Sequence, residues 1–229
     1  YTLNDFDFRS PKKDLIARAT APRSHPNAGM SLFDYPGAYC ERSDGERIAK
    51  IRLEEVQAGF EVVRGEATCR GLAAGSIFTL KDYPRVDQTR EYLVTSVSHA
   101  ADSDAFEASS VPTGDAYRCW FTAVPASQPF RLPRSTPRPH ISGPQTAIVV
   151  GASGQEVCTD EHGRVKVQFH WDRRGKADDN SSCFIRVAQM WAGRNWGTIF
   201  TPRVGQEVIV EFLESDPDRP IITGRVYNG

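Results

Sequence analysis

The chain has 229 residues, 39% of them hydrophobic, and its 28 Lys and Arg residues nearly balance its 29 Asp and Glu residues. This length allows one large domain or two of ordinary size, with enough apolar content for a sizeable core. Residues 146–229 carry 10 basic and 11 acidic side chains, and the earlier residues carry 18 of each sign. Neither part has the basic excess expected of a nucleic-acid binder or of a protein held on an anionic membrane.

No window approaches the roughly 20 apolar residues of a membrane span, and no signal peptide opens the chain. Because residue 1 is tyrosine, we expect the chain to be part of a longer protein. The cysteines are odd in number and form no CxxC pair, so they do not predict a zinc site. We interpret them as small hydrophobic residues inside strands, reduced in a protein that folds in the cytoplasm. They are Cys40, Cys69, Cys119, Cys158 and Cys183.

The first 32 residues carry few regular signals. TLNDFDFRSP and LIARAT are each compatible with a short strand, and PRSHPNAGMS is expected to be irregular. A helix is predicted over 46–64, because apolar residues recur there at steps of four and three. Ser43 or Asp44 is its candidate cap, and Gly59 argues against an unbroken helix. The apolar face of this helix consists of Ala49, Leu53, Val56, Phe60 and Val63.

After the helix, alternation and turn signals predict strands at about 66–71, 76–81, 90–99 and 116–123, with a loop over 102–115. The segment 125–145 contains six prolines, which keep the backbone extended and remove hydrogen-bond donors. We therefore expect it to be a stiff connector between two domains rather than a flexible tether.

Beyond the connector, period-2 alternation predicts a small closed β-barrel. Val165, Val167, Phe169 and Trp171 fall on one face of a strand, opposite Arg164, Lys166, Gln168 and His170. A second strand places Val208, Val210 and Phe212 on one face. The segments 202–207 and 216–220 are typical of rigid turns at a barrel rim.

Two short patterns offer carboxylates beside imidazoles. These are Asp160–Glu161–His162 and His170–Trp171–Asp172. Adjacent strand residues point to opposite faces, so neither triplet can by itself converge on a metal. The first is better interpreted as a turn before the Val165 strand, with Gly163 at a positive φ. With no hydrolase or phosphate-loop motif present, we expect no catalytic, cofactor-binding or metal residues.

Two further features favour contacts rather than chemistry. Arg173–Arg174–Gly175–Lys176 is a basic cluster followed at once by Asp178–Asp179, so a solvated loop is expected, with a charged subunit contact as the alternative. Trp191 and Trp196 flank a short loop. We expect them to pack against the barrel end or another subunit, because base stacking would need clustered cations nearby.

Longer stretches resemble one family. LNDFDFRSP, YPGAY (35–39), VRGEATCRGLAAGSIFTL and EYLVTSVSH (91–99) resemble the tail-hub domain of VgrG proteins, the spike hubs of bacterial type VI secretion systems. PFRLP and PRPHISGPQTAIVVG (137–151) are similar to the junction into that family's small barrel. DEHGRVKVQFHWD, NSSCFIRVAQMWAG, PRVGQEVIVEFLE and DPDRPIITGRVYN resemble the barrel itself, an oligonucleotide/oligosaccharide-binding (OB) fold.

The resemblance implies a mainly β fold with an α+β hub region. It implies a remainder of the earlier hub over 1–32, a hub β-barrel over 33–124 with the helix 46–64, the connector 125–145 and a five-stranded OB-fold barrel over 146–229. It also implies a rigid homotrimer on the Hcp tube ring, followed by a needle that meets a PAAR tip and effectors. Such a spike is structural rather than enzymatic. It assembles in the cytoplasm, is then injected, and pierces the target membrane mechanically.

Three alternatives remain open at this point. The chain could belong to a contractile phage tail hub, which neighbouring genes would distinguish. The spike could carry an effector enzyme after its needle. The barrel could also act as a free carbohydrate or nucleic-acid binder, which titration would test.

Overall fold

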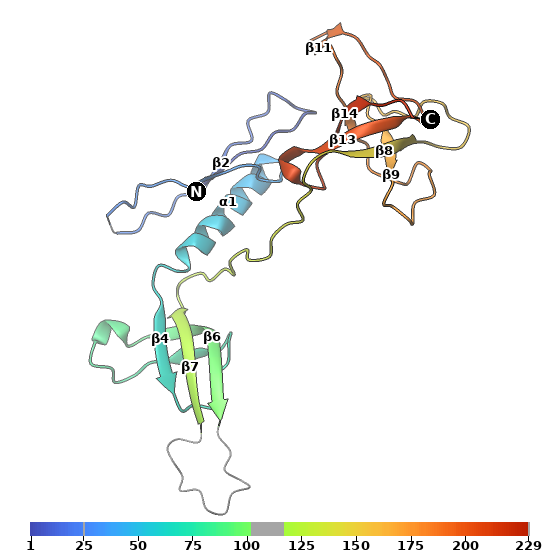
Figure 1. The fold of residues 1–229 in the computed structure, drawn as a ribbon. Helices are drawn as coiled ribbons and strands as arrows, with labels where there is room; N and C mark the ends of the chain where they lie inside the picture. The colour runs from blue at the N-terminus through green and yellow to red at the C-terminus, as the bar shows by residue number, and fades with distance from the viewer. Residues whose placement is uncertain (25, 102–116, 229) are drawn as a thin grey trace, which may run out of the picture. The chain divides into compact units, whose positions relative to one another are not determined.

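The chain is mainly β and divides into two compact units. The computed structural model describes residues 1–24, 26–101 and 117–228, and Figure 1 traces the fold. The first unit comprises Tyr1–Arg134 and the second Ser135–Gly229, so the boundary lies within the segment 125–145. None of the helices in these ranges is long and apolar enough to cross a membrane.

A small sheet and a helix form the first core of unit 1. β1 (Thr2–Leu3) lies between the antiparallel β2 (Ala17–Arg18) and the parallel β3 (Phe33–Asp34). Helix α1 (Arg42–Gln57) contacts β1 and β2. Their shared core is nearly inaccessible to solvent and consists of Leu3, Leu15, Ala17, Tyr39 and Ala49.

Helix α1 begins four residues before the predicted start of the span 46–64. Its N-cap is Glu41, whose side chain makes no capping hydrogen bond. The prediction of a cap at Ser43 or Asp44 is therefore wrong, because both residues are already helical. The backbone closes the first turn instead, since the Glu41 carbonyl accepts hydrogen bonds from the N–H groups of residues 44 and 45.

The helix also ends earlier than predicted, at Gln57. Phe60 lies beyond it and Val63 begins the next strand, so these two residues do not extend the helical face. Gly59 and its neighbours form the turn between the two elements, which fits the low helix propensity of glycine. Within the helix Ala49 is fully buried, but Val56 is half exposed. Apolar spacing alone overestimated both the length of the helix and its buried face.

The start of α1 is set by a close contact with an aromatic ring. Gly45 lies against Tyr39, and a Cβ added to Gly45 would be 2.5 Å from two ring atoms. The Tyr39 hydroxyl donates a 2.6 Å hydrogen bond to the backbone carbonyl of Leu15. Burial, with smaller contributions from nearby carboxylates, raises the pKa of the Tyr39 hydroxyl. The first helical turn is therefore fixed by tertiary packing rather than by a cap.

Four longer strands form an antiparallel sheet in the order β4-β7-β6-β5. Their bounds are β4 (Val63–Ala67), β5 (Ile77–Thr79), β6 (Glu91–Ala101) and β7 (Tyr117–Pro125), and the short 3-10 helix η1 (Val86–Gln88) precedes β6. All four strands correspond to predicted ones. β4 begins three residues early because Val63 pairs with Ala123. The predicted loop over 102–115 lies outside the described residues.

The first half of the proline-rich segment is anchored to helix α1. The Gln128 side-chain amide donates hydrogen bonds to the carbonyls of Gln57 and Ala58, at 3.1 and 2.8 Å. Arg131 pairs with Glu54 at 2.8 Å. Because terminal helix carbonyls lack intrahelical partners, Gln128 supplies a cap that the helix itself does not provide.

The second half of the same segment is anchored to unit 2. The Ile141 N–H donates a 3.0 Å hydrogen bond to the carbonyl of Ser215, and Arg138 pairs with Asp216 at 3.2 Å. These contacts hold the chain against the short helix η2 (Leu213–Ser215) and the turn that follows it. Each half of the segment is thus attached to the unit that it belongs to.

Unit 2 contains a five-stranded sheet in the order β10-β14-β13-β8-β9. Its strands are β8 (Gln145–Val150), β9 (Lys166–Phe169), β10 (Arg186–Val187), β13 (Glu207–Phe212) and β14 (Pro220–Arg225). The sheet closes where Val165 and Ile185 exchange backbone hydrogen bonds of 3.0 and 2.7 Å, which joins the β9 and β10 ends. The closed order, with β10 parallel to β14, matches the five-stranded OB-fold barrel.

The barrel core follows the predicted alternation. Val165, Val167, Val208 and Val210 are fully buried, and Phe169 packs at the edge of their cluster. The prediction fails for Trp171, which is 67% exposed. β9 ends at Phe169, so alternation no longer directs residue 171 inward, and its ring stacks on that of Phe169 from outside at 5.2 Å. The full core comprises Ala147, Val149, Val165, Val167, Ile185, Val208, Val210 and Ile222.

The cysteines do not all behave as small core residues inside strands. Cys119 does, because it is buried in β7. Cys40, Cys69 and Cys183 are exposed outside the strands, and Cys158 is half-buried in a loop. All five are free thiols. The four cysteines other than Cys119 lie in a bend or in loops, where strand alternation does not operate.

Candidate functional site

The Asp160–Glu161–His162 pattern forms a turn. The Gly163 N–H donates a 3.1 Å hydrogen bond to the Asp160 carbonyl, and Gly163 has φ +67°, as predicted. The Asp160 carboxylate accepts hydrogen bonds from the backbone N–H groups of His162 and Arg164, and it pairs with the Arg164 guanidinium at 2.6 Å. Burial acts to raise the pKa of this carboxyl, but the hydrogen bonds from Arg164 and His162 lower it overall. The carboxylate is thus committed to holding the turn.

The second pattern is dispersed. The ring of His170 lies 3.1 Å from the Thr146 hydroxyl. The Trp171 indole N–H donates to Gln145 at 2.9 Å, and the Asp172 carboxylate accepts backbone N–H groups of its own loop. The three side chains therefore bind three different partners. Among the residues that the structure describes, no three His, Cys, Asp or Glu side chains gather as metal ligands.

The basic cluster lies in a folded loop. The Asp172 carboxylate accepts the N–H groups of Arg174 and Gly175 at 3.0 Å each, and Gln168 accepts the Ala177 N–H. The loop surrounds an open depression of about 350 Å³ that also includes the acidic Asp178. Because acidic and basic groups alternate around it, the loop does not present the positive electrostatic potential that would attract a phosphate.

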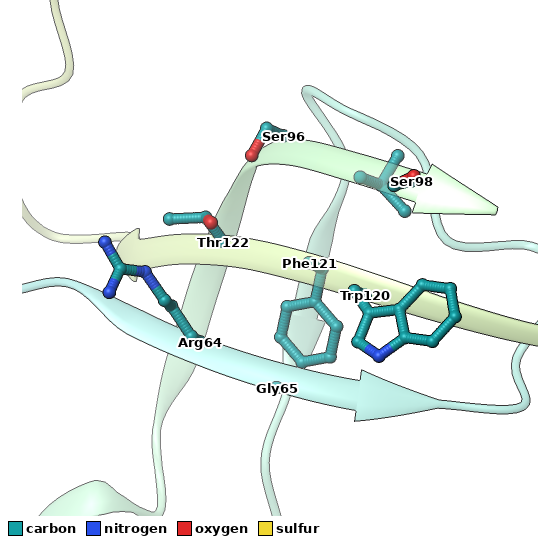
Figure 2. Close-up of a pocket in the computed structure, with 8 residues that line it drawn as sticks. Arg64, Gly65, Ser96, Ser98, Trp120, Phe121 and Thr122 are labelled. Atoms are coloured by element: carbon teal, nitrogen blue, oxygen red, sulfur yellow. The ribbon is translucent and has the colours of Figure 1, made fainter.

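A larger open groove of about 550 Å³ lies along the β4-β7-β6 sheet. Figure 2 shows Arg64 and Gly65 on β4, Trp120 to Thr122 on β7, and two serines on β6. Gly65 leaves room for the Phe121 ring, since a Cβ there would lie 2.5 Å from the Phe121 Cζ. The groove carries a single charged side chain, Arg64, and no acid–base pair.

The predicted turns at the barrel rim are confirmed. Gly205 has φ +90° within the turn that opens β13. The Asp216 carboxylate accepts the Asp218 N–H at 2.9 Å, and the Asp216 carbonyl accepts the Arg219 N–H at the same distance. These side chains shape the backbone of the rim.

The two loop tryptophans lie at and within a small hairpin. β11 (Ala192–Gly193) pairs with β12 (Trp196–Gly197). Trp191 and Trp196 meet edge to face at 5.7 Å but remain 62% and 57% exposed, so they do not pack against the barrel end as one reading predicted. Three neighbours that the sequence reasoning missed are also exposed, namely Met190, Ile199 and Phe200. The run MWAGRNWGTIF carries the signal, because it places five large apolar residues around a two-residue polar turn.

Comparison with known proteins identifies both units. Residues 1–105 match the phage tail baseplate hub (GPD) family, and residues 145–227 match the type VI secretion system/phage-baseplate injector OB domain. The type VI secretion system spike protein VgrG1a of Pseudomonas aeruginosa is 52% identical over 227 residues, covering 99% of this chain and 35% of that protein. VgrG5 of the same organism is 39% identical over 240 residues, covering 99% of this chain and 30% of that protein.

A solved structure supports the fold. It is an E. coli protein described as a component of the type VI secretion system with structural similarity to the T4 bacteriophage tail proteins gp27 and gp5. It superposes with a TM-score of 0.59 at 24% identity, covering 82% of this chain and 45% of that one. The chain spans about a third of the length of the curated relatives that it matches.

Proposed function

The chain belongs to the VgrG family of type VI secretion spike proteins, and we propose that it forms the hub and barrel of a rigid spike in a contractile injection machine. The observation that supports this most directly is the order of the two matched families, with the hub first and the injector barrel second. The spike is a homotrimer at the tip of the Hcp tube. Its role is structural, because it delivers effectors without transforming a substrate.

The mechanism is mechanical. Sheath contraction drives the spike through the target membrane, so the parts behind the needle must resist bending and shear. A barrel closed by backbone hydrogen bonds has no free edge at which strands separate, and the Val165–Ile185 pair supplies that closure here. The membrane is pierced rather than bound. The Hcp ring, a PAAR tip and effectors are partners of the assembled spike, which assembles in the cytoplasm and leaves the cell on firing.

The proline-rich segment links the two units in this mechanism. Its halves are anchored separately, by Gln128 to helix α1 and by Arg138 to the Asp216 turn. Pro137 lies between these anchors, and proline restricts the backbone there. We expect Pro137→Gly combined with Pro139→Gly to weaken secretion while both units stay folded. Unchanged export of the tube protein would remove the segment from the mechanism.

The function is tested in the bacterium that encodes the chain. The gene is deleted and complemented, and the tube protein is measured in the culture medium by immunoblot. Loss of export in the deletion strain, restored by complementation, is expected. Sedimentation of the full natural protein should give a trimer, and a monomer at all concentrations would contradict the assembly. Export that continues without the gene would contradict the spike role.

The alternative is a contractile phage tail hub, because residues 1–105 match the phage tail baseplate hub family. Neighbouring genes decide between the two machines. Sheath, Hcp and ATPase genes indicate secretion, and capsid genes indicate a phage. A spike that carries an enzyme domain after its needle is a variant of the first proposal, and reading the complete gene would identify it.

A further inference from the structure

The hairpin of unit 2 is longer than its two short strands. Beyond the β11–β12 pairs, the Trp191 carbonyl accepts the Thr198 N–H at 2.9 Å, and the Gln189 side chain accepts the Phe200 N–H at 2.9 Å. Asn195 closes the turn at φ +63°. We name residues 189–200 the apolar arm. Figure 1 shows it extending away from the barrel strands of the same unit, with β11 near its end.

Both faces of the apolar arm are apolar. The register pairs Gly193 with Trp196, which places Trp191 and Trp196 on one face, in agreement with their ring contact. The same register places Met190 and Ile199 on the opposite face, where they are 85% and 80% exposed. An isolated two-stranded hairpin is only marginally stable in water. This hairpin therefore needs a partner that covers both faces.

The exposed area matches a protein contact. A buried aromatic residue covers about 150–250 Å², so five large side chains that are half to mostly exposed present on the order of 700 Å² of apolar surface. The largest apolar patch on a typical monomer is about 300–600 Å². One partner in a standard protein interface contributes about 800 Å². The arm alone supplies most of that amount.

The chemistry favours a second copy of this chain over a lipid bilayer. A two-stranded ribbon has two open edges, and their N–H and C=O groups would find no hydrogen-bond partners in hydrocarbon. Another protein can pair with them. The arm carries one charge, Arg194, so several arms can approach one another with little repulsion. A ring of identical copies also presents a neighbour on each side of every arm.

We propose that the apolar arm is an inter-subunit clasp, in which residues 189–200 of one copy lie against a neighbouring copy. This inference rests on the proposed function, which supplies the neighbouring copies. It names the surface through which the barrel units hold together, and the family match does not specify that surface.

A photo-crosslinking experiment locates the contact. The photoreactive amino acid p-benzoylphenylalanine replaces Trp196 in the full natural protein, and copies with two different affinity tags are mixed and irradiated. The control places it at Val86, an apolar residue of unit 1 that is more exposed (84%) than Trp196 (57%). Covalent adducts that contain both tags are expected from position 196 and not from position 86.

Substitution then tests the energetic role of the arm. Removing a central aromatic contact commonly weakens association about thirtyfold. Trp196→Ser should therefore raise, by about that factor, the protein concentration at which half of the copies are dissociated. Val86→Ser should leave that concentration unchanged. Circular dichroism checks that each variant is folded.

The outcomes separate the two proposals. Copies that assemble without crosslinks from position 196, or that tolerate Trp196→Ser, overturn the clasp and leave the spike intact. Copies that crosslink only to lipid or to other proteins also overturn it. Copies that never assemble overturn both proposals.

Discussion

Closure of the barrel can be tested at Ile185. Its side chain is 1% exposed, and its backbone exchanges two hydrogen bonds with Val165 at the seam between β9 and β10. Ile185→Ala keeps those backbone bonds but removes the packing around them. Ile199→Ala is the matched control, since Ile199 is 80% exposed in the same unit.

The expected magnitude follows from burial. The substitution removes three methylene equivalents at about 0.8 kcal/mol each, and the unfilled space adds to this, for a loss of about 3 kcal/mol within the usual range for such truncations. An exposed site should change stability by less than about 0.5 kcal/mol. Since about 1.4 kcal/mol is tenfold in an equilibrium constant, the open state of the barrel should become roughly a hundredfold more populated.

Hydrogen exchange measured by mass spectrometry is the appropriate assay, because it reports each unit separately. Peptides that contain β9, β10 and β14 should lose protection in Ile185→Ala, while peptides of unit 1 stay unchanged. The measurement is made on dilute protein so that association does not contribute. Equal effects of the two substitutions, or no effect at Ile185, would refute the reasoning that this seam closes a packed barrel.

Three further predictions concern local contacts. Gly45→Ala should lower the free energy of unfolding of unit 1 by about 1–3 kcal/mol, although alanine has the better helix propensity, because the added Cβ meets the ring of Tyr39. Urea unfolding measures this change. The control Gly59→Ala, where a Cβ meets open space, should not lower the free energy of unfolding. Asp160→Asn should cost about 2 kcal/mol near pH 7. The pKa of this carboxyl is lowered in the folded protein. Its stabilisation is therefore present above the unfolded pKa of about 3.9 and is lost as pH falls through the folded pKa. The free energies of unfolding of the natural protein and of Asp160→Asn, plotted against pH, should converge in strong acid. Gln128→Ala should lower the free energy of local opening at the end of α1, measured by hydrogen exchange, by about 1 kcal/mol, which is the usual cost of losing a cap. Ser127→Ala should leave that free energy unchanged.

The candidate surfaces were only partly predictable. The polar patterns at 160–162 and 170–172 attract attention in the sequence because catalytic sites use the same residue types. The structure disperses them, since the carboxylate at 160 holds its own turn and the ring at 170 faces Thr146. The apolar arm drew notice only through its tryptophans. Met190 and Ile199 were not singled out, because nothing in their spacing indicates that the hairpin leaves the barrel.

The sequence by itself determined two strands of the barrel, the order of the two units and the family. Alternation at Val165, Val167, Val208 and Val210 is a local property that any half-buried strand displays. The family is recognised from stretches of consecutive residues, which requires no knowledge of tertiary contacts. The bounds of α1, the exposure of Trp171 and the closure at Val165–Ile185 were decided by tertiary structure. Each depends on which distant residue arrives as a neighbour, such as Tyr39 against Gly45, and spacing along one segment carries no information about a partner far away in the chain.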